Sequence, residues 1–390
     1  MISRPAALAR RMADIAPFHV MALLARARAL EAAGRSIVHL EIGEPDFPTA
    51  APILAAGQRA LAEGRTRYTA AAGLPELRQA ISDHYRECYG VEVPARRILV
   101  TPGASGALQL ATAATIDPGD RVLLTDPGYP CNRQFVRLVE GVAVGVPVGS
   151  ETRYQLTDGL VERHWDERTT TVLLASPANP TGTVIPPREL MALVATVEAR
   201  GGRVIMDEIY HGLTYGAPMQ TALAFSDRVW VVNSFSKYYG MTGWRLGWLV
   251  APEEGVDAAE KLAQNLFLAA STPAQYAALA AFTPEAATIF AERRREFQAR
   301  RDFLRPALVE LGFEIPVTPD GAFYLYADCG RFTDDSQAFA LHLLENAGVA
   351  ITPGLDFGDH RPNRHVRFAY TNAIPSLAEG VERLRGALRS

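Results

Sequence analysis

The chain has few cysteines, and their spacing excludes two classes of protein. Cys88, Cys131 and Cys329 lie far apart and are odd in number, so they form neither a disulfide framework nor a paired thiolate metal site. The eight histidines also show no paired metal-ligand spacing, and we expect no metal. Free thiols in a reducing compartment are the simplest interpretation.

The chain also lacks long apolar runs and an excess of charge. No window reaches the length of a membrane-spanning helix, and the N-terminal segment with Arg4, Arg10 and Arg11 has no continuous apolar stretch like that of a secretory signal. The net charge of −4, from 39 basic and 43 acidic side chains, gives no electrostatic attraction for nucleic acid or for an anionic membrane. We therefore expect a cytoplasmic protein with small-molecule partners, no nucleic acid and no membrane.

Length and pattern predict two domains. A chain of 390 residues that is 48% hydrophobic suits two domains with a sizeable core. From residue 98 onward, short apolar runs alternate with helical stretches, which indicates βαβ units and a mostly parallel sheet. We expect an α/β protein with a large domain over residues 49–284. A smaller α+β domain is expected to combine residues 1–48 with 285–390, including an N-terminal arm over residues 1–17.

Three local expectations can be checked directly. Residues 37–42 alternate like a strand. Residues 285–311 are typical of a long helix that Pro306 kinks or divides. Within it, Arg293-Arg294-Arg295 is expected on a solvated face, because Glu292 and Glu296 flank this run.

The segment over residues 234–248 places one lysine in an unusual position. The run 229–232 is β-branched and aromatic, as in a buried strand, and Lys237 follows the end of that strand. Arg245 comes eight residues later in a glycine-rich stretch, so a second cation can fold back to the same place. This combination suggests an imine-forming lysine beside an anion site. An ordinary lysine in a surface loop is the competing interpretation.

Other chemistry-bearing residues follow the ends of apolar runs in the same way. The turn 101–106 connects a strand to a helix N-terminus, where backbone N–H groups favour a phosphate; a plain tight turn is the alternative. In an open parallel sheet, ligands bind beyond the carboxyl ends of the strands. We therefore expect one pocket that gathers Gly103, Ala104, Ser105, Tyr129, Asn179, Asp207 and Lys237.

A single cofactor, pyridoxal 5′-phosphate, would use all of these groups. An imine-forming lysine needs burial or a neighbouring cation to act near neutral pH. A carboxylate at Asp207 would keep a pyridine nitrogen protonated. Phosphate would be held by Arg245, Ser234 and the amides of 103–105, the ring would stack on Tyr129, and its phenolic oxygen would bond Asn179 and Tyr210. Arg367, between apolar neighbours in a predicted strand, needs an anion, either a substrate or an internal salt bridge.

Six motifs in order resemble the class I/II, fold type I pyridoxal phosphate aminotransferases over essentially the full length of the chain. They are Gly43-Glu44-Pro45-Asp46-Phe47, Asp126-Pro127-Gly128-Tyr129-Pro130, Asn179-Pro180-Thr181-Gly182, Asp207-Glu208-Ile209-Tyr210, Ser234-Phe235-Ser236-Lys237 with Arg245, and Arg367-Phe368.

This resemblance implies a fold, a site and an activity. The expected fold is a large domain around a mostly parallel seven-stranded sheet, plus the smaller domain. Lys237 would form the Schiff base and carry the proton, with Asp207 and Tyr210 in catalytic roles. Arg367 would bind the substrate α-carboxylate, with Gly43, Asn179 and Phe18 beside it. Tyr68 would reach the phosphate of a neighbouring subunit, which implies a homodimer with shared active sites.

The implied reaction is a ping-pong transfer of an amino group from an L-amino acid to a 2-oxo acid. A β-eliminating C–S lyase of the same fold and a non-catalytic ligand sensor are the alternatives. A nicotinamide dehydrogenase would need a G-x-G-x-x-G that 103–106 does not match. Because residues 105–109 contain no lysine, we favour neutral, apolar or aromatic amino donors over acidic ones.

Overall fold

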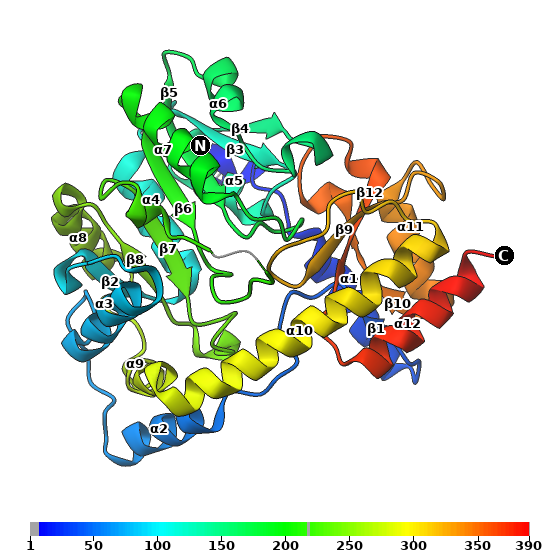
Figure 1. The fold of residues 1–390 in the computed structure, drawn as a ribbon, viewed down its shortest axis with the longest axis horizontal. Helices are drawn as coiled ribbons and strands as arrows, with labels where there is room; N and C mark the ends of the chain where they lie inside the picture. Colours follow the sequence, from blue (N-terminus) through cyan, green and yellow to red (C-terminus); the bar gives the residue numbers. More distant parts are fainter. Residues whose placement is uncertain (1–7, 217–218, 390) are drawn as a thin grey trace, which may run out of the picture.

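The computed structural model describes residues 8–216 and 219–389. A seven-stranded sheet lies at the centre of one part of the molecule (Figure 1). Its strand order is β2-β8-β7-β6-β5-β3-β4, and β8 alone runs antiparallel to its neighbours, so the predicted mostly parallel sheet is confirmed. The strands are β2 (Ile98–Thr101), β3 (Arg121–Asp126), β4 (Val142–Pro147), β5 (Thr169–Ala175), β6 (Arg203–Asp207), β7 (Trp230–Ser234) and β8 (Gly247–Val250).

Helices cover both faces of this sheet because its central strands are apolar on both sides. Alternate residues along one strand belong to different cores: Val231 packs with the cluster under α3, α7 and α9, and Val232 with the cluster under α4 and α8. The helices of this part are α2 (Ala51–Ala62), α3 (Pro75–Tyr89), α4 (Gly103–Thr115), α5 (Pro130–Leu138), α6 (Asp158–His164), α7 (Pro187–Ala199), α8 (Val256–Leu266) and α9 (Thr272–Leu279).

A second part of the molecule has its own sheets and core. β12 (His365–Ala369) pairs antiparallel with β9 (Tyr324–Asp328) and β11 (Thr352–Pro353). The predicted strand at 37–42 is shorter than expected, because only β1 (Val38–His39) pairs, in parallel, with β10 (Val349–Ala350). The helices here are α1 (His19–Ala32), α11 (Ser336–His342), continued by a π-helical turn over Leu343–Ala347, and α12 (Ile374–Ala387).

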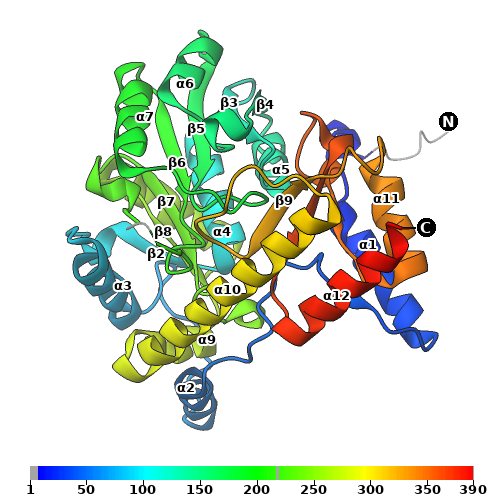
Figure 2. The ribbon, with the colours of Figure 1, turned by 45° about the vertical axis from the view of Figure 1, so that its right-hand side comes forward.

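A long helix, α10 (Pro284–Leu311), runs from α9 and α2 toward α12 and so spans both parts (Figures 1 and 2). It is continuous through Pro306, so of the two expected effects, a kink or a division, the division is wrong. Proline removes only one backbone N–H, and the buried side chains of Phe297, Leu304 and Leu308 pack along the helix. The prediction that Arg293-Arg294-Arg295 lies on a solvated face is correct for Arg294 and Arg295, which are exposed, but not for Arg293, which is partly buried. Arg293 donates to the Pro48 carbonyl at 2.8 Å and lies over the Phe47 ring.

The predicted N-terminal arm lies partly outside the described residues, which begin at residue 8. Its described portion contains one short 3-10 helix, Arg10–Ala13. Within 8–216 and 219–389, no helix has both the length and the apolar character that crossing a membrane would require.

Candidate active site

A cavity of about 410 Å³ lies at the carboxyl ends of the central strands, where the two parts of the molecule meet. Most of the predicted site residues line it. They are Phe18, Gly43, Ala104, Ser105, Tyr129, Asn179, Asp207, Tyr210, Ser234, Lys237, Arg245 and Arg367. Two predicted residues do not line the cavity: Gly103, which precedes the lining residue Ala104 in the chain, and Tyr68, which is 82% exposed.

Lys237 reaches the cavity from the loop after β7. Its Nζ donates to the Gly43 carbonyl at 2.6 Å. Burial lowers the pKa of Lys237 to about 8; the nearby Arg367 and Arg245 cations lower it too, against the carboxylates of Glu44 and Asp207. A substantial fraction of this amine is therefore neutral near physiological pH, as nucleophilic and proton-accepting chemistry requires.

Asp207 ends β6 and presents a buried carboxyl group to the same space. Its Oδ1 accepts from the Ile209 backbone N–H at 3.0 Å. Burial raises the pKa of Asp207 to about 7, while this hydrogen bond and the Lys237 cation lower it. A cation placed against this side chain would favour its ionised form further. The protonated nitrogen of a pyridine ring is such a cation.

The N-terminus of α4 and the Arg245 guanidinium lie close together and could hold an anion. Free N–H groups at this end of a thirteen-residue helix favour a phosphate. Gly103 has φ +70°, and a Cβ there would lie 2.7 Å from Nη2 of Arg245, so only glycine permits this close approach. Ser234 contacts the Leu246 carbonyl and Ser236 beneath the same region. The donors fit a phosphate group.

Arg367 is buried but has no carboxylate partner among the described residues. Its Nη1 donates to Asn179 Oδ1 at 2.8 Å, and its Nη2 donates to the Glu41 carbonyl at 2.5 Å and to Thr352 Oγ1 at 3.2 Å. Its Nε has no hydrogen-bond partner. The alternative of an internal salt bridge is therefore wrong, and the guanidinium is free to bind an external carboxylate.

Aromatic residues complete the walls. Tyr129 caps α5 and packs edge-on against Phe18, with ring centroids 6.5 Å apart. The hydroxyls of Tyr210 and Tyr324 lie 2.9 Å apart. A Cβ at Gly43 would lie 1.9 Å from the Tyr324 hydroxyl, so this wall also depends on glycine.

Sequence reasoning missed Tyr324, although it lies 4.3 Å below the Arg367 guanidinium. No turn motif marks it, because it lies inside an apolar strand. Placing Tyr324 in the site requires knowing that it pairs with Ala369 across β9 and β12, which no local sequence motif reveals. The other unpredicted residues of the cavity wall include Val20, Met21, Glu41, Ile42, Glu44, Leu108 and Thr242.

The chain matches the family "Aminotransferase class I and II" over residues 35–384. It is 40% identical over 380 residues to the valine–pyruvate aminotransferase of Mycobacterium tuberculosis, covering 97% of this chain and 98% of that protein. It is 36% identical to the probable aspartate/prephenate aminotransferase of Aquifex aeolicus, covering 98% of each. A crystal structure of an aminotransferase from Mycobacterium tuberculosis superposes with a TM-score of 0.95 at 39% identity, covering 99% of this chain and 100% of that chain.

These matches and the cavity define an enzyme of the transferase class. The chain belongs to the class I and II aminotransferases, with the fold type I architecture. It is a pyridoxal phosphate-dependent aminotransferase, which transfers an amino group between an amino acid and a 2-oxo acid. The residues present fit this cofactor, since the cavity combines a helix N-terminus beside a guanidinium, a buried carboxyl group and a lysine whose pKa burial lowers to about 8.

Proposed function

We propose that Lys237 holds the cofactor as a Schiff base and carries the proton during amino transfer. The observation that supports this most is the proximity of the buried amine, with its pKa lowered to about 8, to the buried Arg367 guanidinium, whose Nε has no hydrogen-bond partner. Arg367 holds the substrate α-carboxylate, and Asn179 and the Gly43 backbone orient it. When bound, pyridoxal phosphate supplies an electron-withdrawing ring that weakens the bond from Cα to hydrogen.

The other residues hold and tune the cofactor. The α4 N-terminus from Gly103 to Ser105 binds its phosphate, together with Arg245 and Ser234. Asp207 accepts from the ring nitrogen, Tyr129 stacks on the ring, and Asn179 and Tyr210 donate to its phenolic oxygen. Phe18 lines the substrate side. Once the amino group of the substrate has taken the place of Lys237 on the cofactor, the freed Lys237 amine would accept the Cα proton and give it back, so the two half-reactions of a ping-pong sequence would share one base.

The chain is proposed to work as a cytoplasmic homodimer. Tyr68 lies outside the cavity of its own chain, and α2, which precedes it in the sequence, carries the exposed side chains of Leu54 and Leu61. We propose that a second copy covers this surface and that Tyr68 reaches the partner's phosphate site. The cysteines are free thiols, which supports a reducing compartment.

Two domains are proposed to carry the site. The large domain comprises residues 49–284, and the small domain comprises residues 1–48 and 285–390. Support comes from the separate hydrophobic cores, one of which combines Leu23 of α1 with Phe368 of β12. The cavity lies between them, so their relative position controls access to it.

We propose neutral, apolar or aromatic amino acids as the preferred donors. Among the described residues that line the cavity, the cations are Lys237, Arg245 and Arg367, and each has a role above. None remains to bind a second carboxylate. The substrate side is apolar and includes Phe18, Val20, Met21, Ile42 and Leu108. The name of the Mycobacterium tuberculosis relative, which cites valine and pyruvate, agrees with this choice.

A half-reaction tests the proposal. Single amino acids are added to the holoenzyme without an acceptor, and the absorbance of the bound cofactor and the released 2-oxo acid are measured. We expect one 2-oxo acid per site, formed faster from valine, leucine or phenylalanine than from aspartate. Continuous release of pyruvate and ammonia from cystathionine would instead identify the C–S lyase. Unchanged cofactor absorbance with every amino acid would identify a ligand sensor.

A further inference from the structure

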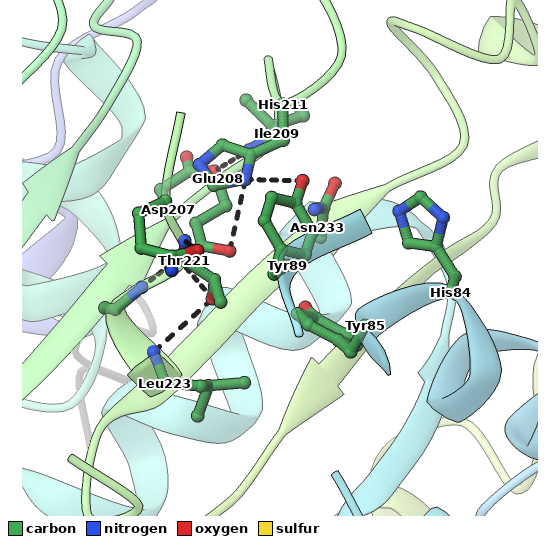
Figure 3. A network of polar contacts seen from close by, with 12 residues as sticks. His84, Tyr85, Tyr89, Asp207, Glu208, Ile209, His211, Thr221, Leu223 and Asn233 are labelled. Carbon is green, nitrogen blue, oxygen red and sulfur yellow. Dashed lines mark hydrogen bonds and ion pairs between the residues drawn. The ribbon is translucent and has the colours of Figure 1, made fainter. Parts of the chain in front are cut away.

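The turn that carries Asp207 and Tyr210 to the cavity also contains Glu208 and His211, whose polar contacts are shown in Figure 3. Asp207 and Tyr210 line the cavity, whereas Glu208 and His211 do not. Glu208 and His211 are nevertheless buried, with exposed fractions of 0% and 5%. The His211 backbone N–H donates to the Glu208 carbonyl at 2.9 Å, which closes the turn. This hydrogen bond connects the residues that line the cavity and those that do not within one turn.

Glu208 and His211 attach the turn to two other segments. Glu208 Oε1 accepts from Thr221 Oγ1 at 2.9 Å and from the Ala222 backbone N–H at 2.8 Å. His211 Nδ1 lies 2.9 Å from the Tyr89 hydroxyl at the end of α3. The rear of the turn is thus fixed to residues 221–222 and to α3.

The remaining carboxyl oxygen of Glu208 has no hydrogen-bond partner among the described residues and lies 3.5 Å from His211 Nδ1. A buried carboxylate with one oxygen unsatisfied is costly. Burial raises the pKa of Glu208 to about 8, and Asp207 adds to this shift; the Ala222 and Thr221 donors oppose it. Burial also lowers the pKa of His211 to about 3, with a contribution from His84.

We propose that Glu208 and His211 are positioning residues for Asp207 and Tyr210. We further propose that the pair is uncharged, with a protonated Glu208 carboxyl group and a neutral His211 ring. This inference rests on the proposed role of Asp207 at the ring nitrogen. A second full negative charge on the adjacent residue would disfavour ionised Asp207. A neutral pair fixes the turn without that repulsion.

The groups that face the pair support this neutrality. Tyr85 and Tyr89 approach from α3 with hydroxyls whose pKa values burial raises well above the usual range. His84, on the same helix, has a pKa that burial lowers to about 4. Asn233 approaches from β7 with a neutral amide. Apart from Asp207, the labelled neighbours are thus uncharged at neutral pH.

The test measures cofactor dissociation from holoenzyme variants whose folded fraction is matched by circular dichroism. Glu208→Gln keeps both hydrogen-bonding ends and the neutral charge, so its dissociation constant should stay within about threefold of wild type. Glu208→Leu should weaken cofactor binding roughly tenfold or more, the size of effect known for outer partners of metal ligands. Arg97→Met is the matched control. It removes a buried guanidinium, bonded to the Ala251 carbonyl at 2.8 Å, that does not line the cavity, and should lower stability without weakening the cofactor.

An infrared measurement reads the proton directly. The holoenzyme should show the carbonyl band of a protonated carboxyl group that disappears in Glu208→Gln and persists in Asp207→Ala. Should Glu208→Leu not accumulate as folded protein, this band and a Tyr89→Phe variant, expected to weaken the cofactor severalfold, decide the question.

Three results would overturn the inference. The first is the absence of the infrared band, and the second is wild-type cofactor affinity in Glu208→Leu, or in Tyr89→Phe if Glu208→Leu does not fold. The third is an equal loss of cofactor affinity in Glu208→Gln and Glu208→Leu. If Asp207→Ala itself leaves cofactor affinity unchanged, the proposed role of Asp207 fails instead.

Discussion

At the scale of single residues, the site depends on cations that act on one another. Arg367 and Arg245 both lower the pKa of Lys237, while burial supplies the largest effect. The same guanidinium that holds a substrate carboxylate therefore helps to keep the reacting amine neutral. When an anionic substrate binds to Arg367, this help is reduced and Lys237 becomes a stronger base.

The pKa of Lys237 predicts how the cofactor-free protein captures pyridoxal phosphate. Only the neutral amine reacts, so the capture rate should rise with pH through about 8. Arg367→Gln removes a lowering influence, so this midpoint should shift upward. Stopped-flow absorbance measures it, with Arg364→Gln, an exposed guanidinium 3.4 Å from the Asp328 carboxylate, as the control. A midpoint that is the same in Arg367→Gln and wild type would contradict the coupling.

His39 provides a separate test of electrostatics: it does not line the cavity, although its partner Glu41 does. The hydrogen bond to Glu41, at 2.7 Å, raises the pKa of His39 from 6.5 to about 9. Because the folded-state pKa is the higher one, this pair stabilises the protein fully below pH 6.5 and is lost as the pH rises through about 9. The His39→Gln variant should therefore be less stable than wild type at pH 6 and nearly equal to it above pH 9.

Urea unfolding across this pH range measures the effect. The control is His342→Gln, which removes an exposed histidine with no ion-pair partner among the described residues. A stability difference between His39→Gln and wild type that grows with pH would have the wrong sign and would reject the assignment.

At the scale of elements, the site residues that could be predicted from the sequence are those that follow the carboxyl ends of buried strands. Buried parallel strands such as β6 and β7 are continuous apolar runs, so their carboxyl ends and the residues after them were predictable. The edge strand β4 is only partly buried, and Gly145 and Pro147 interrupt its apolar pattern, so it was missed. Tyr324 was missed because its place depends on pairing across β9 and β12 rather than on any local motif.

The first turn of α4 predicts a matched pair of glycine variants. Gly103 and Gly201 both have φ +70°, but a Cβ at Gly201 meets nothing within 4 Å, whereas at Gly103 it meets Arg245. Each alanine variant should lose about 1 kcal/mol or more of unfolding free energy from backbone strain. Gly103→Ala alone should also weaken cofactor binding, as measured by equilibrium dialysis. Equal cofactor affinity in the two variants would argue against a phosphate site here.

At the scale of the whole molecule, the cavity belongs to both parts of the chain. Tyr324, Arg367 and the lining residues between positions 18 and 44 come from the part with the small sheets, and the remaining lining residues come from the part with the seven-stranded sheet. α10 connects the two, and its buried Arg300 holds Asp46 at 2.8 Å and the Thr371 carbonyl at 2.5 Å. The substrate groups and the cofactor groups are thus delivered by different cores.

Shared active sites in a dimer predict complementation between two defective chains. Lys237→Ala and Tyr68→Ala chains each lack one group, but a mixed dimer contains one site with both. Co-refolding equal amounts should restore about a quarter of wild-type activity if subunits pair at random. Activity no higher than the mean of the two separate variants would place Tyr68 outside the partner's site.

The most direct test of the central claim is to find the residue that bonds to the cofactor. The chain has two lysines, Lys237 in the cavity and Lys261 exposed on α8. Borohydride reduction of the holoenzyme, followed by peptide mass spectrometry, should place the cofactor on Lys237 in wild type and in Lys261→Ala, and nowhere in Lys237→Ala. A label on Lys261, or a Lys237→Ala protein that transfers amino groups at the wild-type rate, would contradict the assignment.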